Sequence, residues 1–171
     1  EPVVRAMAAE GRPYKGVLYA GLILTADGPK VLEFNARLGD PEAQVVLPLL
    51  ATDFLTVVEA VVDGTLDKTP VSFVPQASVC VVLASSGYPG EYQTGHVING
   101  LNDVSPGTLV FHAGTKRYGS QVVTNGGRVL SVVSTGDTVK EALDKIYSEI
   151  PRISFKGMQY RKDIGAQVLN Y

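Results

Sequence analysis

The chain has 171 residues and a mass of 18.2 kDa, which suits one or two domains and excludes a disulfide-stapled miniprotein or a large complete enzyme. Hydrophobic residues make up 45% and charged residues 19%, a balance that excludes an intrinsically disordered tail. The net charge of −2 and the pI near 5.7 argue against a general nucleic-acid-binding protein.

The charge is unevenly distributed along the chain. Residues 1–110 hold 6 basic and 12 acidic side chains, whereas residues 111–171 hold 9 basic and 5 acidic ones. A basic C-terminal third can serve a small anionic ligand such as phosphate through charge-assisted hydrogen bonds. Ordinary solvated lysines on the surface are the plain alternative.

The single cysteine and the hydropathy pattern indicate the compartment. Cys80 lies in the apolar run 77–83, which predicts a buried, inert thiol and excludes a disulfide framework. No apolar stretch reaches the roughly 18 residues that a membrane helix needs. We therefore expect a cytoplasmic protein that has no membrane partner. The chain begins at Glu1 with what reads as a helix, which suggests a piece of a longer protein.

The first elements are a helix and a hairpin. An early proline and a following glycine predict a short helix over 2–10 that ends at Gly11. Two β-rich runs follow, 16–24 and 30–35. The Asp27-Gly28 pair between them is typical of a hairpin turn.

Turn chemistry and a second helix come next. Residues 37–42 predict a loop that leads into an apolar segment, 43–50. Asp53 is a favoured capping residue for a helix over 54–62, and Gly64 is a typical stop signal.

Residues 65–76 contain two prolines and few apolar residues, which predicts a linker. We therefore expect one domain over 1–64 and a second, β-rich domain over 77–171. The expected strands of the second domain are 77–84, 95–98, 108–114, 120–124 and 128–134. Short strands at this spacing favour a compact antiparallel sheet or a barrel-like cap.

One helix is expected within this β-rich part. Asp137 is its predicted cap. Its predicted apolar face consists of Val139, Ala142, Leu143, Ile146 and Ile150. A last strand and turn over 157–164 close the chain, so the predicted fold class is α+β.

A candidate site lies on the second strand of the hairpin. Strand alternation predicts that Glu33, Asn35 and Arg37 share one face, while Phe34 points to a core. Carboxylate and carboxamide oxygens are ligands that Mg²⁺ prefers, and an arginine can hold a transferring phosphoryl group. The alternative is a half-exposed strand with a polar outer face.

Residues 32–44, Leu-Glu-Phe-Asn-Ala-Arg-Leu-Gly-Asp-Pro-Glu-Ala-Gln, resemble the signature of the glycinamide ribonucleotide synthetase family, ATP-grasp ligases of purine biosynthesis. Further segments resemble later motifs of the same family in the same order: 14–21, 86–90, 111–115, 124–130 and 160–165. The resemblance implies the end of an ATP-grasp core, an antiparallel hairpin with helices, followed by a small β-rich C-terminal domain with one or two helices.

The resemblance also implies a reaction. It makes Glu33 and Asn35 the ligands of Mg²⁺ or Mn²⁺ on ATP, and it places Arg37 beside the acyl phosphate of glycine. The amine of 5-phosphoribosylamine would attack that intermediate and give glycinamide ribonucleotide, ADP and phosphate. Asp40 orients the substrate or the arginine, or else caps a helix, and the helix terminus is the preferred interpretation for Glu42.

Related ligases of phosphoribosyl compounds use a basic pair near the end of the chain to hold the ribose phosphate, which implies this role for Arg161 and Lys162. A surface salt bridge from Arg161 to Asp163 is the alternative. Neighbouring strand residues face opposite sides, so one member of the pair can be structural.

The remaining polar motifs receive structural interpretations. His112 is expected to be a hydrogen-bonded, half-buried residue, and with His96 alone as company it builds no metal cluster. The turn 124–128 is expected to use its glycines for positive φ angles, and a role beside the substrate is the alternative.

The family's N-terminal domains and adenine-binding residues would precede Glu1, so those domains are expected partners and this segment is expected to be inactive alone. Two alternatives remain open. One is another ATP-grasp ligase, biotin carboxylase-like or a phosphoribosylaminoimidazole carboxylase. The other is a non-catalytic scaffold.

Overall fold

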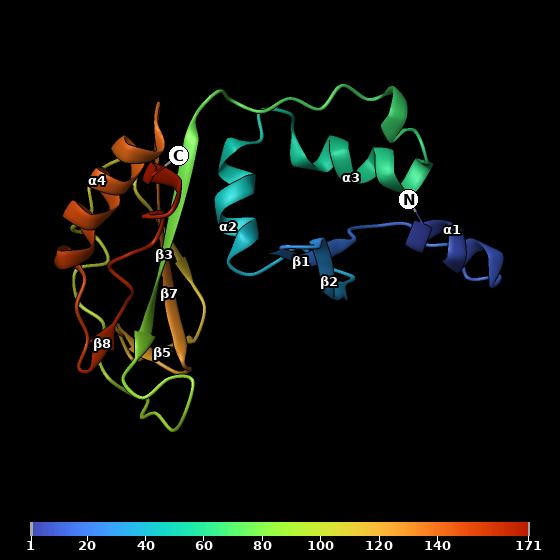
Figure 1. Cartoon of the computed structure of the whole chain (residues 1–171). Helices are drawn as coiled ribbons and strands as arrows, with labels where there is room; N and C mark the ends of the chain where they lie inside the picture. Colours follow the sequence, from blue (N-terminus) through green and yellow to red (C-terminus); the bar gives the residue numbers. More distant parts are fainter. Residues whose placement is uncertain (1, 171) are drawn as a thin grey trace. The chain divides into compact units, whose positions relative to one another are not determined.

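The structure is a computed structural model and describes residues 2–170 (Figure 1). The chain divides into two compact units. The first contains the described residues up to Ala43 together with Leu50–Phe73. The second contains Gln44–Leu49 and the chain from Val74 onward. Both contain helices and antiparallel strands, which confirms the α+β prediction.

The first unit begins with helix α1 (Pro2–Ala9) and the hairpin of β1 (Tyr19–Thr25) and β2 (Gly28–Asn35). The strands pair antiparallel from Tyr19 opposite Asn35 to Thr25 opposite Gly28, which confirms the predicted hairpin. The two turn residues are 26 and 27, and Gly28 follows with a φ of 95°. A glycine suits this left-handed backbone because it has no Cβ.

Helix α2 (Glu42–Val46) and the 3-10 helix η1 (Leu47–Leu49) occupy the apolar segment, and α3 (Phe54–Asp63) follows. Asp53 caps α3, since its carboxylate accepts a bond from the backbone N–H of Thr56 at 3.0 Å. Gly64 ends the helix with a φ of 72°. Both predicted boundaries of this helix are confirmed. The 3-10 helix η2 (Leu66–Lys68) lies beyond it.

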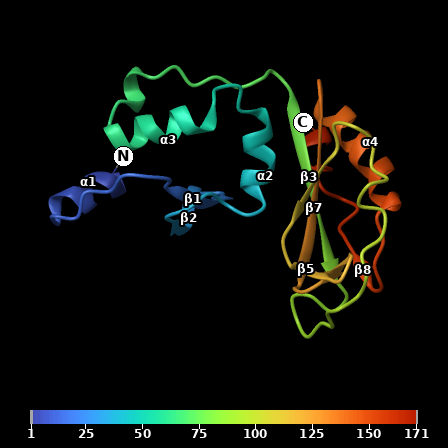
Figure 2. The same ribbon diagram turned by 180° about the vertical axis from the view of Figure 1, so that it is seen from behind.

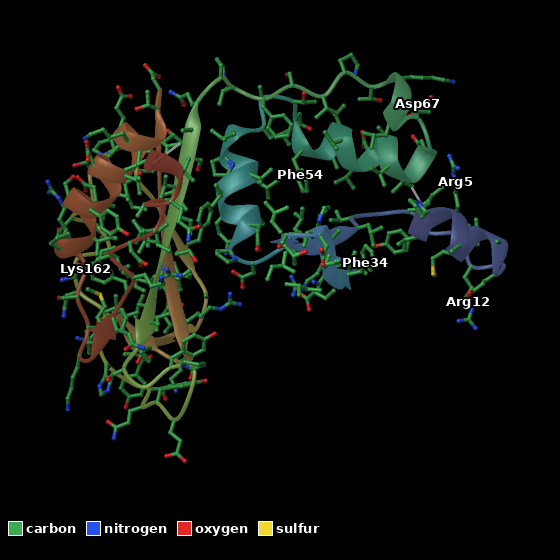
Figure 3. All side chains as sticks on the ribbon, viewed as in Figure 1. Arg5, Arg12, Phe34, Phe54, Asp67 and Lys162 are labelled. Carbon is green, nitrogen blue, oxygen red and sulfur yellow. The ribbon has the colours of Figure 1, made fainter. Side chains whose placement is uncertain are left out.

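The first unit buries few apolar side chains. Among its described residues, Ala60 is the one hydrophobic side chain that is buried. Leu24 and Leu32 on the hairpin are 84% and 67% exposed. Phe34 (Figure 3), expected to face a core, is 45% exposed. It borders an apolar pocket with Val4 and Met7 of α1. That prediction of a core under the hairpin is wrong for the residues described.

The second unit is built on a four-stranded antiparallel sheet in the order β4-β7-β3-β8. Its strands are β3 (Ala77–Ser85), β4 (Leu109–His112), β7 (Arg128–Gly136) and β8 (Met158–Gln159). The long central strands β3 and β7 are nearly continuous apolar runs, because side chains on both of their faces are buried.

Two strand predictions in this unit need correction. Residues 95–98 form no strand, only an isolated bridge between Val97 and Val123. An unpredicted strand, β5 (Thr115–Tyr118), pairs with β6 (Gln121–Thr124) in a separate ribbon. Its sequence, Thr-Lys-Arg-Tyr, is mostly exposed and lacks the alternation that marks a half-buried strand.

Helix α4 (Val139–Glu149) packs against β3 and β7, on one face of the sheet (Figure 2). Ala142, Leu143 and Ile146 are buried as predicted. The predicted cap is wrong by one residue, because the hydroxyl of Thr138, not the side chain of Asp137, accepts a bond from the N–H of Glu141 at 3.1 Å.

The helix leads into the 3-10 turn η3 (Ile150–Arg152), and η4 (Val168–Asn170) ends the described chain. The core between α4 and the sheet includes the fully buried side chains of Val81, Leu83, Val129, Leu130, Val132, Ile146, Ile150 and Ile153.

The paired glycines after β6 have a steric role. Neither Gly126 nor Gly127 has a left-handed φ, so the expected positive φ angles are wrong. A Cβ on Gly127 would instead collide with the ring of Tyr88, whose Cε2 would lie at 2.8 Å. A Cβ on Gly114 would meet the backbone oxygen of Arg128 at 2.6 Å. These glycines let the Tyr88 loop and two turns approach each other closely.

Candidate active-site residues

Glu33 and Asn35 lie side by side at the end of β2. The carboxamide nitrogen of Asn35 donates a hydrogen bond to Oε1 of Glu33 at 2.8 Å, so the two side chains share a face, as strand alternation predicts. The bond uses the amide nitrogen of Asn35 and not the carbonyl oxygen, the atom that a hard cation would bind. The carboxylate of Glu33 and the carbonyl oxygen of Asn35, both suitable metal ligands, therefore lie together at an accessible strand end.

Arg37 follows the strand and does not belong to it. Because β2 ends at Asn35, alternation does not extend to Arg37. Its guanidinium donates to the backbone oxygen of Leu38 at 2.9 Å. It still lies within electrostatic reach of the hairpin, since its charge partly opposes the rise in the pKa of Tyr19 that the bond to Glu42 and the nearby acidic groups cause.

Tyr19 is a site residue that the sequence analysis missed. It is half-buried, lies opposite Asn35 in the hairpin, and donates its hydroxyl to Oε1 of Glu42 at 2.9 Å. This bond is the main reason why the pKa of Tyr19 is raised, and the nearby charges of Glu42 and Glu33 act in the same direction. The hairpin register, once known, is the signal that would have singled out Tyr19.

The loop between β2 and α2 is organised by Glu42. The side chain of Glu42 folds over Gly39, where an added Cβ would collide with the carboxylate and lie 2.9 Å from its Cδ. The N–H of Ala43 donates to the backbone oxygen of Gly39 at 2.9 Å. Glu42 begins α2, as expected of a helix terminus, and also holds Tyr19. Asp40 is exposed in the same loop.

The second unit holds the basic pair. Arg161 makes two hydrogen bonds to the carboxylate of Asp163, at 2.9 and 2.7 Å, so the salt bridge considered as an alternative is present. This bonding raises the pKa of Arg161 and lowers that of Asp163. Lys162 is exposed on the surface of the unit (Figure 3).

The histidines build no metal site. His112 is exposed, not half-buried as expected, and its Nδ1 lies 3.0 Å from the hydroxyl of Thr115. Across residues 2–170, no three His, Cys, Asp or Glu side chains gather as a metal-binding group. Cys80 is half-buried, less than the sequence predicts. Within the part of the chain that the structure describes, no helix is long and apolar enough to cross a membrane.

Comparison with known families identifies both parts of the chain. Residues 78–167 match the family described as "Phosphoribosylglycinamide synthetase, C domain". Residues 1–43 match "Phosphoribosylglycinamide synthetase, ATP-grasp (A) domain". The first match alone covers more than half of the 171 residues.

Individual relatives agree with this match. The phosphoribosylamine–glycine ligase of Caldanaerobacter subterraneus subsp. tengcongensis is 54% identical over 166 residues, which cover 97% of this chain and 40% of that protein. The trifunctional purine biosynthetic protein adenosine-3 of Gallus gallus is 50% identical over 167 residues, 96% of this chain and 17% of that protein. The chain thus spans about two fifths of the bacterial ligase.

Solved structures show the same fold. The phosphoribosylamine–glycine ligase of Thermotoga maritima superposes with a TM-score of 0.76 at 38% identity, over 93% of this chain and 39% of that one. The biotin carboxylase domain of the Hydrogenobacter thermophilus 2-oxoglutarate carboxylase has a TM-score of 0.60 at 16% identity, over 99% and 38%, which is a likeness of fold alone. With the family matches on both sides of residue 44, the chain belongs to the phosphoribosylglycinamide synthetase family of ATP-grasp ligases.

Proposed function

We propose that this chain is part of an ATP-dependent ligase that joins glycine to 5-phosphoribosylamine and forms glycinamide ribonucleotide, ADP and phosphate. Its similarity to proteins named phosphoribosylamine–glycine ligase supports this assignment. The chain spans about two fifths of their length. In this proposal the remaining three fifths, with the N-terminal domains, complete the active site.

The observation that carries the proposal is the Glu33–Asn35 pair at the end of β2. A carboxylate and a carboxamide, joined at 2.8 Å and accessible at a strand end, fit a Mg²⁺ or Mn²⁺ ion that takes its remaining ligands from ATP phosphates and water. Such an ion, when bound, would neutralise phosphate charge and make the γ-phosphorus easier to attack. In the proposal, Glu33 and Asn35 fix the position of this ion.

The proposed reaction has two steps, and Arg37 serves both. A carboxylate oxygen of glycine attacks the γ-phosphorus, and the bond from that phosphorus to ADP breaks, which gives glycyl phosphate. The amine of phosphoribosylamine then attacks the acyl carbon, a C–N bond forms, phosphate leaves and the amine loses a proton. The guanidinium of Arg37 holds the negative charge of the acyl phosphate, and Asp40 orients substrate or arginine.

The second unit supplies the pentose phosphate site in this proposal, through the basic pair Arg161 and Lys162. Guanidinium and ammonium groups both suit a phosphate. We also propose that residues 1–64 belong to the ATP-grasp domain, 65–76 to a linker and 77–171 to the C-terminal domain. The separate family matches to 1–43 and 78–167 support this division.

The test is phosphate release by a protein of the relatives' full length that contains these residues. ATP, Mg²⁺, glycine and phosphoribosylamine are supplied together and then omitted one at a time. We expect release to require both glycine and phosphoribosylamine. Release that ignores glycine and responds to bicarbonate would move the protein to the carboxylases. No release at all would favour a non-catalytic scaffold.

A charge-removing variant tests the metal ligand in the same assay. We expect Glu33→Gln to lower turnover by about 100-fold or more, since each interaction made with a developing phosphoryl charge contributes several kcal/mol. Glu59→Gln, on the exposed surface of α3 in the same unit, is the matched control and should retain full activity. A folded Glu33→Gln protein with wild-type turnover would remove Glu33 from the metal site.

A further inference from the structure

A cavity of about 400 Å³ lies in the second unit, where β3, β7 and β8 meet. Tyr88, Tyr160 and the methyl groups of Val82 give it apolar and aromatic walls. Its polar groups come from Arg128, Arg161 and Gln159. Two arginines from sequence positions 33 residues apart therefore share one cavity.

Strand pairing explains how Arg128 reaches this cavity. Ala84 on β3 pairs with Arg128 on β7 and, on its other side, with Gln159 on β8. Residues directly opposite each other in neighbouring strands point to the same face of a sheet. Arg128, Ala84 and Gln159 thus form one row across three strands, and the small side chain of Ala84 leaves space between two long polar ones.

The wall above this row is held in place. The amide nitrogen of Gln159 donates to the backbone oxygens of Ser85 and Tyr88, both at 3.0 Å. The ring of Tyr88 lies against Gly127, where a Cβ would collide with it. The loop that carries Tyr88 is therefore fastened to the sheet, and the cavity has a defined shape without a ligand.

The charge of the cavity suits an anion. Among the described residues, no carboxylate lines it. Asp163, the partner of Arg161, is not a lining residue. The guanidinium of Arg128 can donate two parallel hydrogen bonds to a phosphate. Arg161 donates its Nε and Nη2 to Asp163 and can offer the N–H groups of its Nη1 to the same anion. Lys162 is exposed and does not line the cavity.

We propose that Arg128 binds the phosphate of the phosphopentose substrate directly, as a third basic residue beside Arg161 and Lys162. The inference rests on the proposed function, which it refines by naming a residue outside the basic pair. Tyr88 and Tyr160 then contact the pentose ring. Arg128 is in this account a specificity residue that separates phosphorylated pentoses from unphosphorylated ones.

The experiment uses the full-length protein and measures binding of D-ribose 5-phosphate, a stable phosphopentose, by titration calorimetry without ATP. We expect Arg128→Gln and Arg161→Gln each to weaken binding by about tenfold or more, since a hydrogen bond to a charged group contributes about 1.5 to 3 kcal/mol. Lys162→Gln should weaken binding by less than either variant, because Lys162 is exposed and does not line the cavity. Arg117→Gln, an exposed arginine on β5, is the matched control.

Steady-state kinetics separates this inference from the proposed function. Arg128→Gln should raise KM for phosphoribosylamine and leave KM for ATP and glycine unchanged. If the wild-type ligase is active and the Arg128→Gln variant binds ribose 5-phosphate normally, the role of Arg128 is overturned and the proposed function stands. A wild-type protein without ligase activity would overturn the proposed function, whereas binding lost on Arg128→Gln would still support the cavity as a phosphopentose site.

Arg128→Lys guards against a folding defect in the glutamine variant. It keeps the positive charge but loses the two-pronged donation, so its affinity should fall between those of wild type and Arg128→Gln. Ribose without phosphate is the second ligand. If Arg128→Lys and wild type bind ribose equally well, the part of the cavity that contacts the pentose is intact. An Arg128→Lys protein that loses affinity for ribose and for ribose 5-phosphate to the same extent would show a damaged fold and would contradict a direct contact between Arg128 and the phosphate.

Discussion

Glu42 connects two parts of the candidate site through its carboxylate. One oxygen accepts the hydroxyl of Tyr19, which lies opposite Asn35, and the side chain folds over Gly39 in the loop that carries Asp40. The position of the loop and the position of the proposed metal-binding end of β2 are therefore linked by one hydrogen bond. Glu42 and Tyr19 are positioning residues in this account.

A double-mutant cycle tests this link. Tyr19→Phe removes the hydroxyl, and Gly39→Ala displaces the flexible carboxylate, so both break the same bond. We expect each to reduce ligase turnover by about two- to twelvefold, the range of one hydrogen bond of about 0.5 to 1.5 kcal/mol. The double variant should be no slower than the worse single variant. Tyr118→Phe, 73% exposed in the second unit, is the control for the tyrosine change.

Multiplicative losses in the double variant would contradict a shared bond. Equal melting temperatures of the variants would show that the loss concerns the site and not the fold. Since the Tyr19 hydroxyl bond favours the protonated phenol, the pKa of Tyr19 should fall towards its ordinary value in Glu42→Gln, which an ultraviolet titration can follow.

Glu149 is a buried carboxylate that stabilises the second unit. Only 5% of the residue is exposed, and its Oε2 accepts the backbone N–H of Ser105 at 2.7 Å. This bond is the main cause of its lowered pKa, and the charge of Arg152, with Nε at 3.3 Å, adds to it. The ionised form is therefore favoured in the folded state.

A lowered folded-state pKa gives a defined pH dependence. The stabilisation by Glu149 is fully present above about pH 4.3, the ordinary pKa of glutamate, and disappears as the pH falls through the lower folded-state value. We expect the melting temperature of Glu149→Gln to differ from that of wild type most at neutral pH and least in acid. A difference that stays constant down to the acid limit would contradict this linkage.

At the scale of elements, the start of α4 illustrates a boundary that a single hydrogen bond decides. Thr138 accepts the N–H of Glu141, while Oε2 of Glu141 accepts the N–H of Asp137 at 2.9 Å. This reciprocal arrangement resembles a capping box and satisfies two N–H groups at the helix start.

Replacing the cap should destabilise the second unit. Thr138→Ala is expected to lower its free energy of unfolding by about 1 kcal/mol, the usual cost of losing a capping side chain. Asp137→Ala is the matched control and should cost less, because Asp137 bonds to Glu141 through its backbone N–H and its carboxylate accepts only a long bond from Gln76 at 3.5 Å. Urea unfolding followed by circular dichroism measures both free energies. A larger loss of stability in Asp137→Ala than in Thr138→Ala would show that Asp137, and not Thr138, caps the helix.

Sequence patterns predicted the elements whose information is local. The caps Asp53 and Gly64 define α3, the turn before Gly28 defines the hairpin, and apolar periodicity defines α4. They failed where pairing between distant segments decides the outcome. β5 is a strand because β6 pairs with it, and 95–98 is not one because a single bridge forms there.

Part of the candidate site also follows from local sequence, and part of it depends on pairing between distant segments. Alternation over two residues was enough to place Glu33 beside Asn35. The Tyr19–Glu42 bond and the Arg128–Ala84–Gln159 row depend on strand register, which the sequence alone does not give. The steric roles of Gly39 and Gly127 depend on side chains that fold back over them.

At the scale of the whole molecule, the two units differ in how much apolar surface they bury. The second unit has a continuous core between α4 and the sheet. The described residues of the first unit bury Ala60 alone among their hydrophobic side chains, and the hairpin strands are largely accessible. Because burial of apolar surface is the main source of stability, the two units should unfold independently and with different free energies of unfolding.

Hydrogen exchange of this 171-residue chain measures that difference. We expect the amides of β3 and β7 to exchange only through global opening of their unit, and those of β1 and β2 to exchange at least about tenfold faster through local opening. Equal protection of the hairpin and the central strands would mean that the first unit is stabilised by interactions other than apolar burial.

The crowding of Gly39 by Glu42 also constrains how this segment can evolve. The two positions share a volume that cannot hold both a Cβ at 39 and the folded carboxylate from 42. A mutation at 39 is tolerated most easily where 42 has already lost its long acidic side chain, so the two substitutions should be inherited together. Among family members aligned at these positions, glycine at 39 should accompany glutamate at 42, and other residues at 39 should appear mainly where 42 differs.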